Sequence, residues 1–145
     1  MNMMSDRSKV LLMALAAAPD HSLTPVQAQK IAFLVGQEAK KLAPKPFYKF
    51  IAYDYGPFCP DIYNDLGTLE RKGLVSIDRP PGARVRRYRL TSDGLEQIEE
   101  DADSSPLSTY VAQATDWVTS LPFPELIRAI YSRYPAFKKN SVFSG

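Results

Sequence analysis

Five arginines crowd into one stretch of the chain, residues 79–89, and no acidic residue separates them. Alternation at the end of this stretch predicts that Tyr88 and Leu90 face a core, while Arg87 and Arg89 point outward. Guanidinium groups on an extended arm suit contacts with DNA phosphates or with the minor groove. The five are Arg79, Arg84, Arg86, Arg87 and Arg89.

An acidic stretch follows the arginines and offers an alternative explanation for them. Its carboxylates could pair with the basic stretch across a fold or a dimer, instead of leaving it free for phosphate. Both possibilities remain open at the level of sequence. The acidic residues are Asp93, Glu96, Glu99, Glu100, Asp101 and Asp103.

A segment upstream of the arginines combines helical spacing with polar residues that could contact DNA. Ile62, Leu66 and Leu69 are spaced so that one face of a helix here should be buried. The opposite face would present Asn64 and Thr68 to base edges, but its two carboxylates would repel phosphate. This repulsion keeps a protein partner in consideration. The predicted exposed positions are Asp61, Asn64, Asp65, Thr68, Arg71 and Lys72.

A second basic run consists of Lys40, Lys41, Lys45 and Lys49, which could flank a nucleic acid or simply be solvated. Aromatic residues overlap this run and could stack on single-stranded bases. Their alternation is more typical of core packing. These aromatic residues are Phe47, Tyr48, Phe50, Tyr53, Tyr55 and Phe58.

No catalytic or metal-binding pattern is found in the sequence. The single histidine, His21, and the single cysteine, Cys59, cannot build a zinc site alone, and no catalytic triad can be assembled around His21. Cys59 at a helix start could act as a redox sensor, but a small buried or capping residue is the simpler interpretation. We therefore expect no enzyme, no metal and no cofactor.

The composition is that of a folded globular protein, with 45% hydrophobic residues, 23% charged residues and a net charge of +2. This charge is too close to neutral to identify a nucleic-acid-binding protein by itself. The longest apolar run, Val10–Ala18, is far shorter than the roughly 20 residues that span a bilayer. It mimics a signal peptide, but Asp6 lies in the supposed basic region. We interpret it as a core helix of a cytoplasmic protein with no membrane partner.

Caps, periodicity and turns predict the elements that position these residues. Thr24 and Gln27 form a capping box, with Pro25 at the first helical position. The helix over 106–121 carries an apolar stripe that could pack on the first helix or form a homodimer interface. The predicted helices span 5–18, 24–41, 59–72, 91–103, 106–121 and 124–134, and the predicted strands span 47–55, 74–77 and 83–90. Gly56 and Pro57 are predicted to end the first of these strands. We predict a single α+β domain over 1–145, with parts at 1–56, 57–104 and 105–145.

Residues 62–75, IYNDLGTLERKGLV, and residues 86–98, RRYRLTSDGLEQI, resemble the recognition helix, wing and following helix of winged helix-turn-helix repressors of the MarR and PadR kind. The resemblance implies a winged helix-turn-helix with additional N- and C-terminal helices, and a duplex DNA partner. The residues expected to contact DNA are Asn64, Thr68, Arg71, Lys72, Arg84, Arg86, Arg87 and Arg89.

Residues 23–37, LTPVQAQKIAFLVGQ, and residues 52–66, AYDYGPFCPDIYNDL, are similar to the Panacea antitoxin-domain family and its winged-helix relatives, as is the closing YPAFKKNSVF, residues 134–143. This resemblance implies a bacterial or phage-borne protein that neutralises a toxin by binding it. The chain departs from the family by continuing into a full wing. We therefore expect a non-enzymatic bacterial regulator that binds duplex DNA. The alternative is an antitoxin-like or adaptor module that binds a protein such as a toxin.

Overall fold

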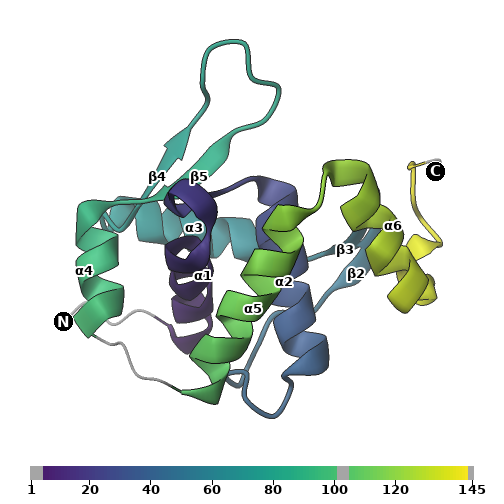
Figure 1. Ribbon diagram of the computed structural model, residues 1–145, viewed down its shortest axis with the longest axis horizontal. Helices are drawn as coiled ribbons and strands as arrows, with labels where there is room; N and C mark the ends of the chain where they lie inside the picture. The colour runs from purple at the N-terminus through teal and green to yellow at the C-terminus, as the bar shows by residue number, and fades with distance from the viewer. Residues whose placement is uncertain (1–4, 101–104, 144–145) are drawn as a thin grey trace.

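Helices α1 (Asp6–Ala17) and α2 (Pro25–Glu38) lie at the centre of the computed structural model, which describes residues 5–100 and 105–143 (Figure 1). Helix α2 begins with the predicted capping box of Thr24 and Gln27. The other α-helices in the described residues are α3 (Pro60–Arg71), α4 (Ser92–Glu100), α5 (Pro106–Ser120) and α6 (Phe123–Arg133). Together with two small antiparallel sheets they give an α+β fold, as predicted.

The larger sheet joins β1 (Ser22–Leu23), β5 (Arg87–Leu90) and β4 (Val75–Asp78) in that order. Tyr88 is its central residue, because it pairs with Leu23 on one side and with Ile77 on the other. Tyr88 and Leu90 are buried and the arginines that alternate with them are not, which confirms the predicted alternation. The two-residue strand β1 was not predicted, since it is too short to show a pattern.

Strands β4 and β5 form a hairpin whose long loop projects from the body of the molecule (Figure 1). The predicted strand over 83–90 is wrong at its start, because β5 begins at Arg87. Pro80 and Pro81 have no N–H to donate to a ladder, and Gly82 has a φ of +79°, so the chain turns here instead of pairing. Residues 79–86 therefore form a loop, which we call the hairpin loop.

The aromatic segment after α2 is a hairpin and not the single strand that was predicted. Strand β2 (Ile51–Tyr53) pairs antiparallel with β3 (Gly56–Phe58), so the prediction that the chain stops pairing at Gly56 is wrong. Gly56 has a φ of +100°, which permits the tight reversal between the two strands. A Cβ at this position would lie only 3.1 Å from the ring of Tyr131, so a larger residue would require that ring to shift.

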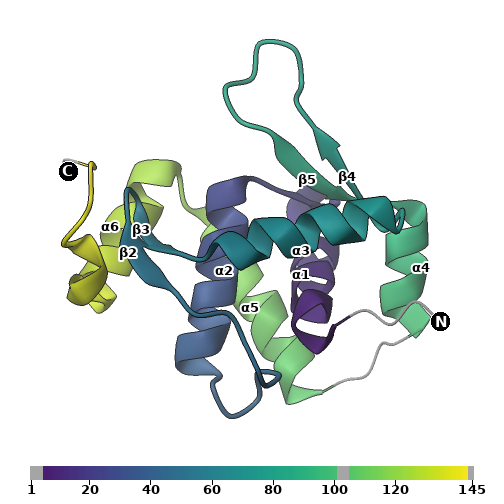
Figure 2. The ribbon, with the colours of Figure 1, turned by 180° about the vertical axis from the view of Figure 1, so that it is seen from behind.

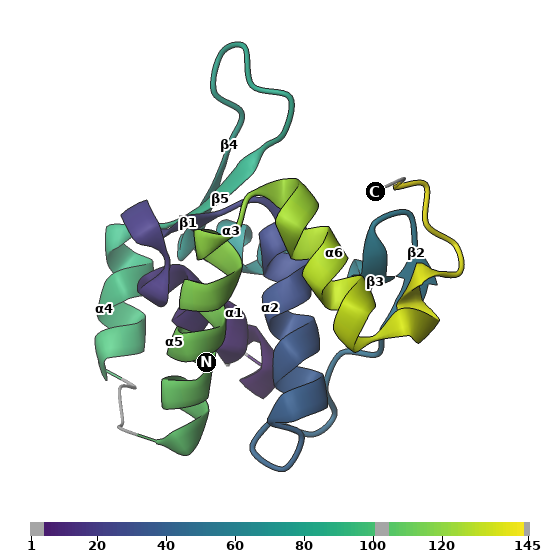
Figure 3. The ribbon, with the colours of Figure 1, turned by 45° about the vertical axis from the view of Figure 1, so that its right-hand side comes forward.

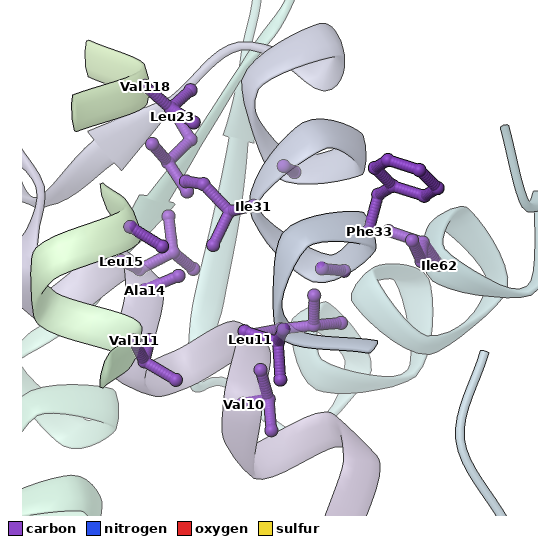
Figure 4. Close-up of a cluster of buried hydrophobic side chains, with 14 of the residues drawn as sticks. Val10, Leu11, Ala14, Leu15, Leu23, Ile31, Phe33, Ile62, Val111 and Val118 are labelled. Atoms are coloured by element: carbon purple, nitrogen blue, oxygen red, sulfur yellow. The ribbon is translucent and has the colours of Figure 1, made fainter. Parts of the chain in front are cut away.

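Buried side chains from α1, α2, α3, α5, α6 and the three-stranded sheet meet in one hydrophobic core. Figure 4 shows Leu11 and Leu15 of α1 near Ile31 of α2 and Val111 of α5. The ring of Phe33 on α2 contacts the rings of Phe50, Tyr134 and Phe137 edge to face, with centroids 4.9 to 5.3 Å away. This core fixes α2 as the element against which α3 and the C-terminal helices are placed.

Helix α5 turns its apolar stripe onto α1 and α2 (Figure 3). Its buried residues are Val111, Ala114, Thr115 and Val118. These residues belong to the core of the chain itself, which supports the packing alternative. No helix in the described part of the chain is long and apolar enough to cross a membrane.

Candidate nucleic-acid interface

Helix α3 lies on the outside of the molecule, in front of α1 and α2 in Figure 2. It buries Ile62, Leu66 and Leu69, as its spacing predicts. The opposite face carries Asn64 and Arg71, which are exposed, and Thr68, which is half-buried. The Thr68 hydroxyl donates to the Asn64 carbonyl at 3.1 Å, and Arg71 donates to the Thr68 hydroxyl at 3.0 Å. Three of the predicted DNA-contacting residues therefore form one hydrogen-bonded row along this face.

The start of α3 is held by a buried glutamine of α2. The Gln29 amide donates to the Cys59 carbonyl at 2.9 Å and accepts from the Cys59 N–H, also at 2.9 Å. Gln29 is 2% exposed and Cys59 is 3% exposed, so this pair of bonds forms in the dry interior. Cys59 is thus a small buried residue, as the simpler interpretation held. The sequence analysis missed Gln29, although a polar residue inside the apolar run of α2 was the available signal.

Arg86 links the hairpin to one side of α3. Its guanidinium carbon lies 5.0 Å from the centre of the Tyr63 ring and 5.3 Å from that of Tyr88. Its Nε donates to the Tyr88 hydroxyl at 2.8 Å. Stacking of this kind fixes a guanidinium without neutralising its charge. Arg86 therefore positions the hairpin beside α3 and keeps a positive charge near the helix.

Of the two carboxylates predicted on the exposed face, Asp61 is exposed, Asp65 is half-buried, and both lie within reach of Arg7 of α1. Asp65 accepts hydrogen bonds from Arg7 at 2.9 Å and from the Tyr48 hydroxyl at 2.6 Å. Asp61 lies 3.8 Å from the same arginine. Burial, followed by the bond to Asp65, raises the pKa of Tyr48, so the phenol remains a donor. The prediction that Asp65 is exposed is wrong, because Arg7, far away in sequence, draws it to the side.

Two of the four hairpin arginines predicted to contact DNA form hydrogen bonds to other residues in and beside the three-stranded sheet. Arg87 donates to the Ser22 hydroxyl at 2.9 Å, which ties β5 to β1. Arg89 donates to the Asp78 carboxylate at 3.3 Å, on β4, and to a backbone carbonyl next to β1. They point away from the core as predicted, but they hold the three strands together. Arg89 is paired with a carboxylate, whereas Arg87 is held by a hydroxyl, which does not neutralise its charge.

The exposed cations of the hairpin lie in its loop, at Arg79 and Arg84. The alternative explanation was that the hairpin arginines pair with the acidic residues that follow them, several of which lie in α4. None of the ion pairs among residues 5–100 and 105–143 joins a hairpin arginine to α4. Asp101 and Asp103 of that acidic stretch lie outside the described residues. Lys72 directly follows α3 and is half-buried, so it lies at the edge of the exposed row and not within it.

An apolar groove lies between the hairpin loop, the start of α2 and the corner between α5 and α6. Its volume is about 460 Å³. Val85 of the hairpin loop is 50% exposed and Phe123 of α6 is 41% exposed on its walls. No group of His, Cys, Asp or Glu in the described part of the chain is arranged to hold a metal ion. The described surface thus carries exposed cations on the hairpin loop and a separate apolar groove.

Comparison with known proteins adds no relative to this picture. No family model matches the chain, and no curated protein matches it in sequence. The resemblance of its helix-and-hairpin segment to winged-helix proteins therefore stays a prediction, as does the resemblance to the Panacea family.

Proposed function

We propose that this protein is a winged helix-turn-helix regulator that binds duplex DNA, with α3 as its recognition helix and the β4–β5 hairpin as its wing. The order of the elements supports this proposal, since α1, β1, α2 and α3 precede the hairpin and the sheet order is β1-β5-β4. A second helix in a helix-turn-helix lies in the major groove and contacts base edges from its exposed face. Here that helix is α3.

The observation that carries the proposal is the composition of the free face of α3. An asparagine amide can contact adenine with two hydrogen bonds, and an arginine can do the same with guanine, so Asn64 and Arg71 are suited to base edges. The sequence suggested that Asp61 and Asp65 would oppose phosphate from this face. Because Arg7 pairs with both at the side of the helix, their repulsion toward DNA is reduced.

The hairpin loop supplies the second contact. Arg79 and Arg84 are exposed on a loop that extends beyond the body of the molecule, where they can reach a phosphate or a minor groove (Figure 1). Arg86 holds the base of this loop against α3. In this proposal the loop positions the protein on DNA and α3 discriminates the sequence.

The test measures binding of the purified chain to labelled DNA from upstream of its own gene by fluorescence anisotropy, over a salt series. Asn64→Ala should weaken binding to the preferred site by about 1–3 kcal/mol and leave binding to random DNA nearly unchanged. Arg79→Ala with Arg84→Ala should weaken both and reduce the salt slope by about 2. Arg128→Ala on α6 is the control for a lost exposed arginine. A wild-type chain that binds no DNA at low salt refutes the proposal.

The apolar groove favours a second function, docking of a protein partner in the manner of an antitoxin. Exposed apolar residues that line a groove are more typical of protein interfaces than of DNA interfaces. Co-purification with the product of the neighbouring gene tests this function. Replacement of Phe123 by Asp should abolish that complex and leave DNA binding unchanged, whereas a complex that survives the change contradicts docking in the groove.

A further inference from the structure

We propose that the segment between α2 and β2, residues 44–50, is a DNA-backbone contact on the side of α3 opposite the hairpin; the inference rests on the proposed function. We call this segment the arm. Tyr48 anchors it, because its hydroxyl donates to Asp65 of α3 at 2.6 Å. The guanidinium carbon of Arg7 lies 4.7 Å from the centre of the Tyr48 ring, so α1 holds the same anchor. The arm is thus fixed to the recognition helix.

The hairpin and the arm hold α3 from opposite sides. Tyr63, which stacks with Arg86 of the hairpin, and Asp65, which binds the arm, are two residues apart in the helix. Two residues of an α-helix correspond to a rotation of about 200°, so these side chains leave the helix in nearly opposite directions. The free face with Asn64 and Arg71 lies between them. Figure 2 shows the hairpin rising above α3, and the chain from α2 to β2 passing below it.

The arm presents cations toward solvent from this position. Tyr48 is 5% exposed, whereas its neighbours Lys49 and Lys45 along the arm are exposed. No ion pair in the described part of the chain uses either lysine. Asp65, which binds the arm, and Asp61 already share Arg7. The arm therefore places beside α3 two ammonium groups that have no carboxylate partner among the described residues.

The shape of duplex DNA gives these lysines a partner. The major groove is about 12 Å wide and is bordered by one phosphate strand on each side, so a helix within it has phosphates on both flanks. The hairpin loop covers one flank of α3 and the arm covers the other. Lys45 and Lys49 would contact the strand that the hairpin does not reach. Such contacts add affinity without sequence preference, and the salt dependence of binding reports them.

The experiment uses a double variant that carries both Lys45→Ala and Lys49→Ala. Its affinity for the preferred site and for random DNA is compared with that of the wild-type chain over a salt series. The double variant should lower affinity for both DNAs by the same factor and reduce the salt slope by about 2, since each lost phosphate contact removes about 0.9. Lys45→Arg with Lys49→Arg should restore the slope. The control is Lys138→Ala with Lys139→Ala, which removes the same charge from the last short helix, at the edge of the molecule in Figure 2.

Three outcomes overturn the inference. A double variant that keeps the wild-type salt slope, in a chain whose binding still depends on Arg84, shows that the arm does not touch DNA. If the control variant loses as much of the salt slope as the double variant, the total charge of the protein and not the position of the lysines determines the salt dependence of binding. A change in sequence preference would mean that the arm orients α3 instead of contacting phosphate. If the wild-type chain binds no DNA at all, the proposed function fails first and the inference with it.

Discussion

Lys30 places a titratable amino group within the core, and its protonation makes the free energy of unfolding depend on pH. The side chain is 3% exposed, and its ammonium group donates to the Pro57 carbonyl at 3.1 Å. Burial lowers the pKa of Lys30 from its ordinary value of 10.5 to about 7. The unfolded chain, in which the lysine is solvated, keeps the ordinary value.

The sign of the effect follows from proton binding in the two states. Between pH 7 and 10.5 the unfolded chain holds the proton on Lys30 and the folded chain releases it, so the free energy of unfolding rises with pH. From pH 7 to pH 9 this one group should add about 2 kcal/mol to the free energy of unfolding. Below pH 7 both states hold the proton and the gain is absent.

Urea unfolding at pH 7, 8 and 9 measures this gain when the wild-type chain is compared with Lys30→Met. The variant has no group to titrate at this position, so its free energy of unfolding should rise by about 2 kcal/mol less than that of the wild type over the same range. Lys41→Met, at an exposed position, should behave as the wild type. Equal pH dependence in the wild type and Lys30→Met would refute the reasoning, because it would mean that the buried lysine keeps its proton.

Three further predictions concern the contacts that position α3 and α4. A Cβ at Gly94 would overlap the carbonyl oxygen of Leu74, so Gly94→Ala should lower the free energy of unfolding by about 3 kcal/mol. The control is Gly67→Ala in α3, where a Cβ would make only ordinary contacts. This variant should raise the free energy of unfolding by about 0.5–1 kcal/mol. Gln29→Leu leaves the Cys59 N–H unpaired in the interior and removes one of the two hydrogen bonds to its carbonyl, so it should cost about 1–3 kcal/mol of unfolding free energy in urea. The Cys59 thiol is 3% exposed and should react with Ellman's reagent only after unfolding, so fast reaction of the native chain would contradict its burial.

The parts of the fold that obey local rules were predictable from the sequence. The capping box at Thr24 involves residues three positions apart, and the buried stripe of α3 depends only on helical spacing. The alternation around Tyr88 depends only on the pleat of a strand. In each case the evidence for an element lies within the element itself, so the pattern and the structure agree.

The parts that failed depend on residues far apart in the chain. Gly56 was interpreted as a stop, because nothing nearby in sequence indicates that Tyr131 will close the space above it. Asp65 was placed on the exposed face, because helical spacing does not indicate that Arg7, 58 residues earlier, lies beside that helix. Short strands such as β1 have too few residues to carry a pattern. These features depend on packing between distant parts of the chain, which local sequence patterns do not predict.

The same distinction decides which arginines can test DNA binding. By type and spacing, Arg87 and Arg89 were the strongest candidates, since alternation points them away from the core. Each is bound to a neighbouring strand, so replacing both would remove the side-chain bonds that add to the backbone pairing of β5 with β1 and β4, and would weaken the sheet. Lost DNA binding in that variant would therefore carry no information about contact. Arg79 and Arg84 have no such structural role in the sheet, so among the hairpin arginines these two are the positions where a reduced salt dependence with an unchanged unfolding free energy identifies a phosphate contact.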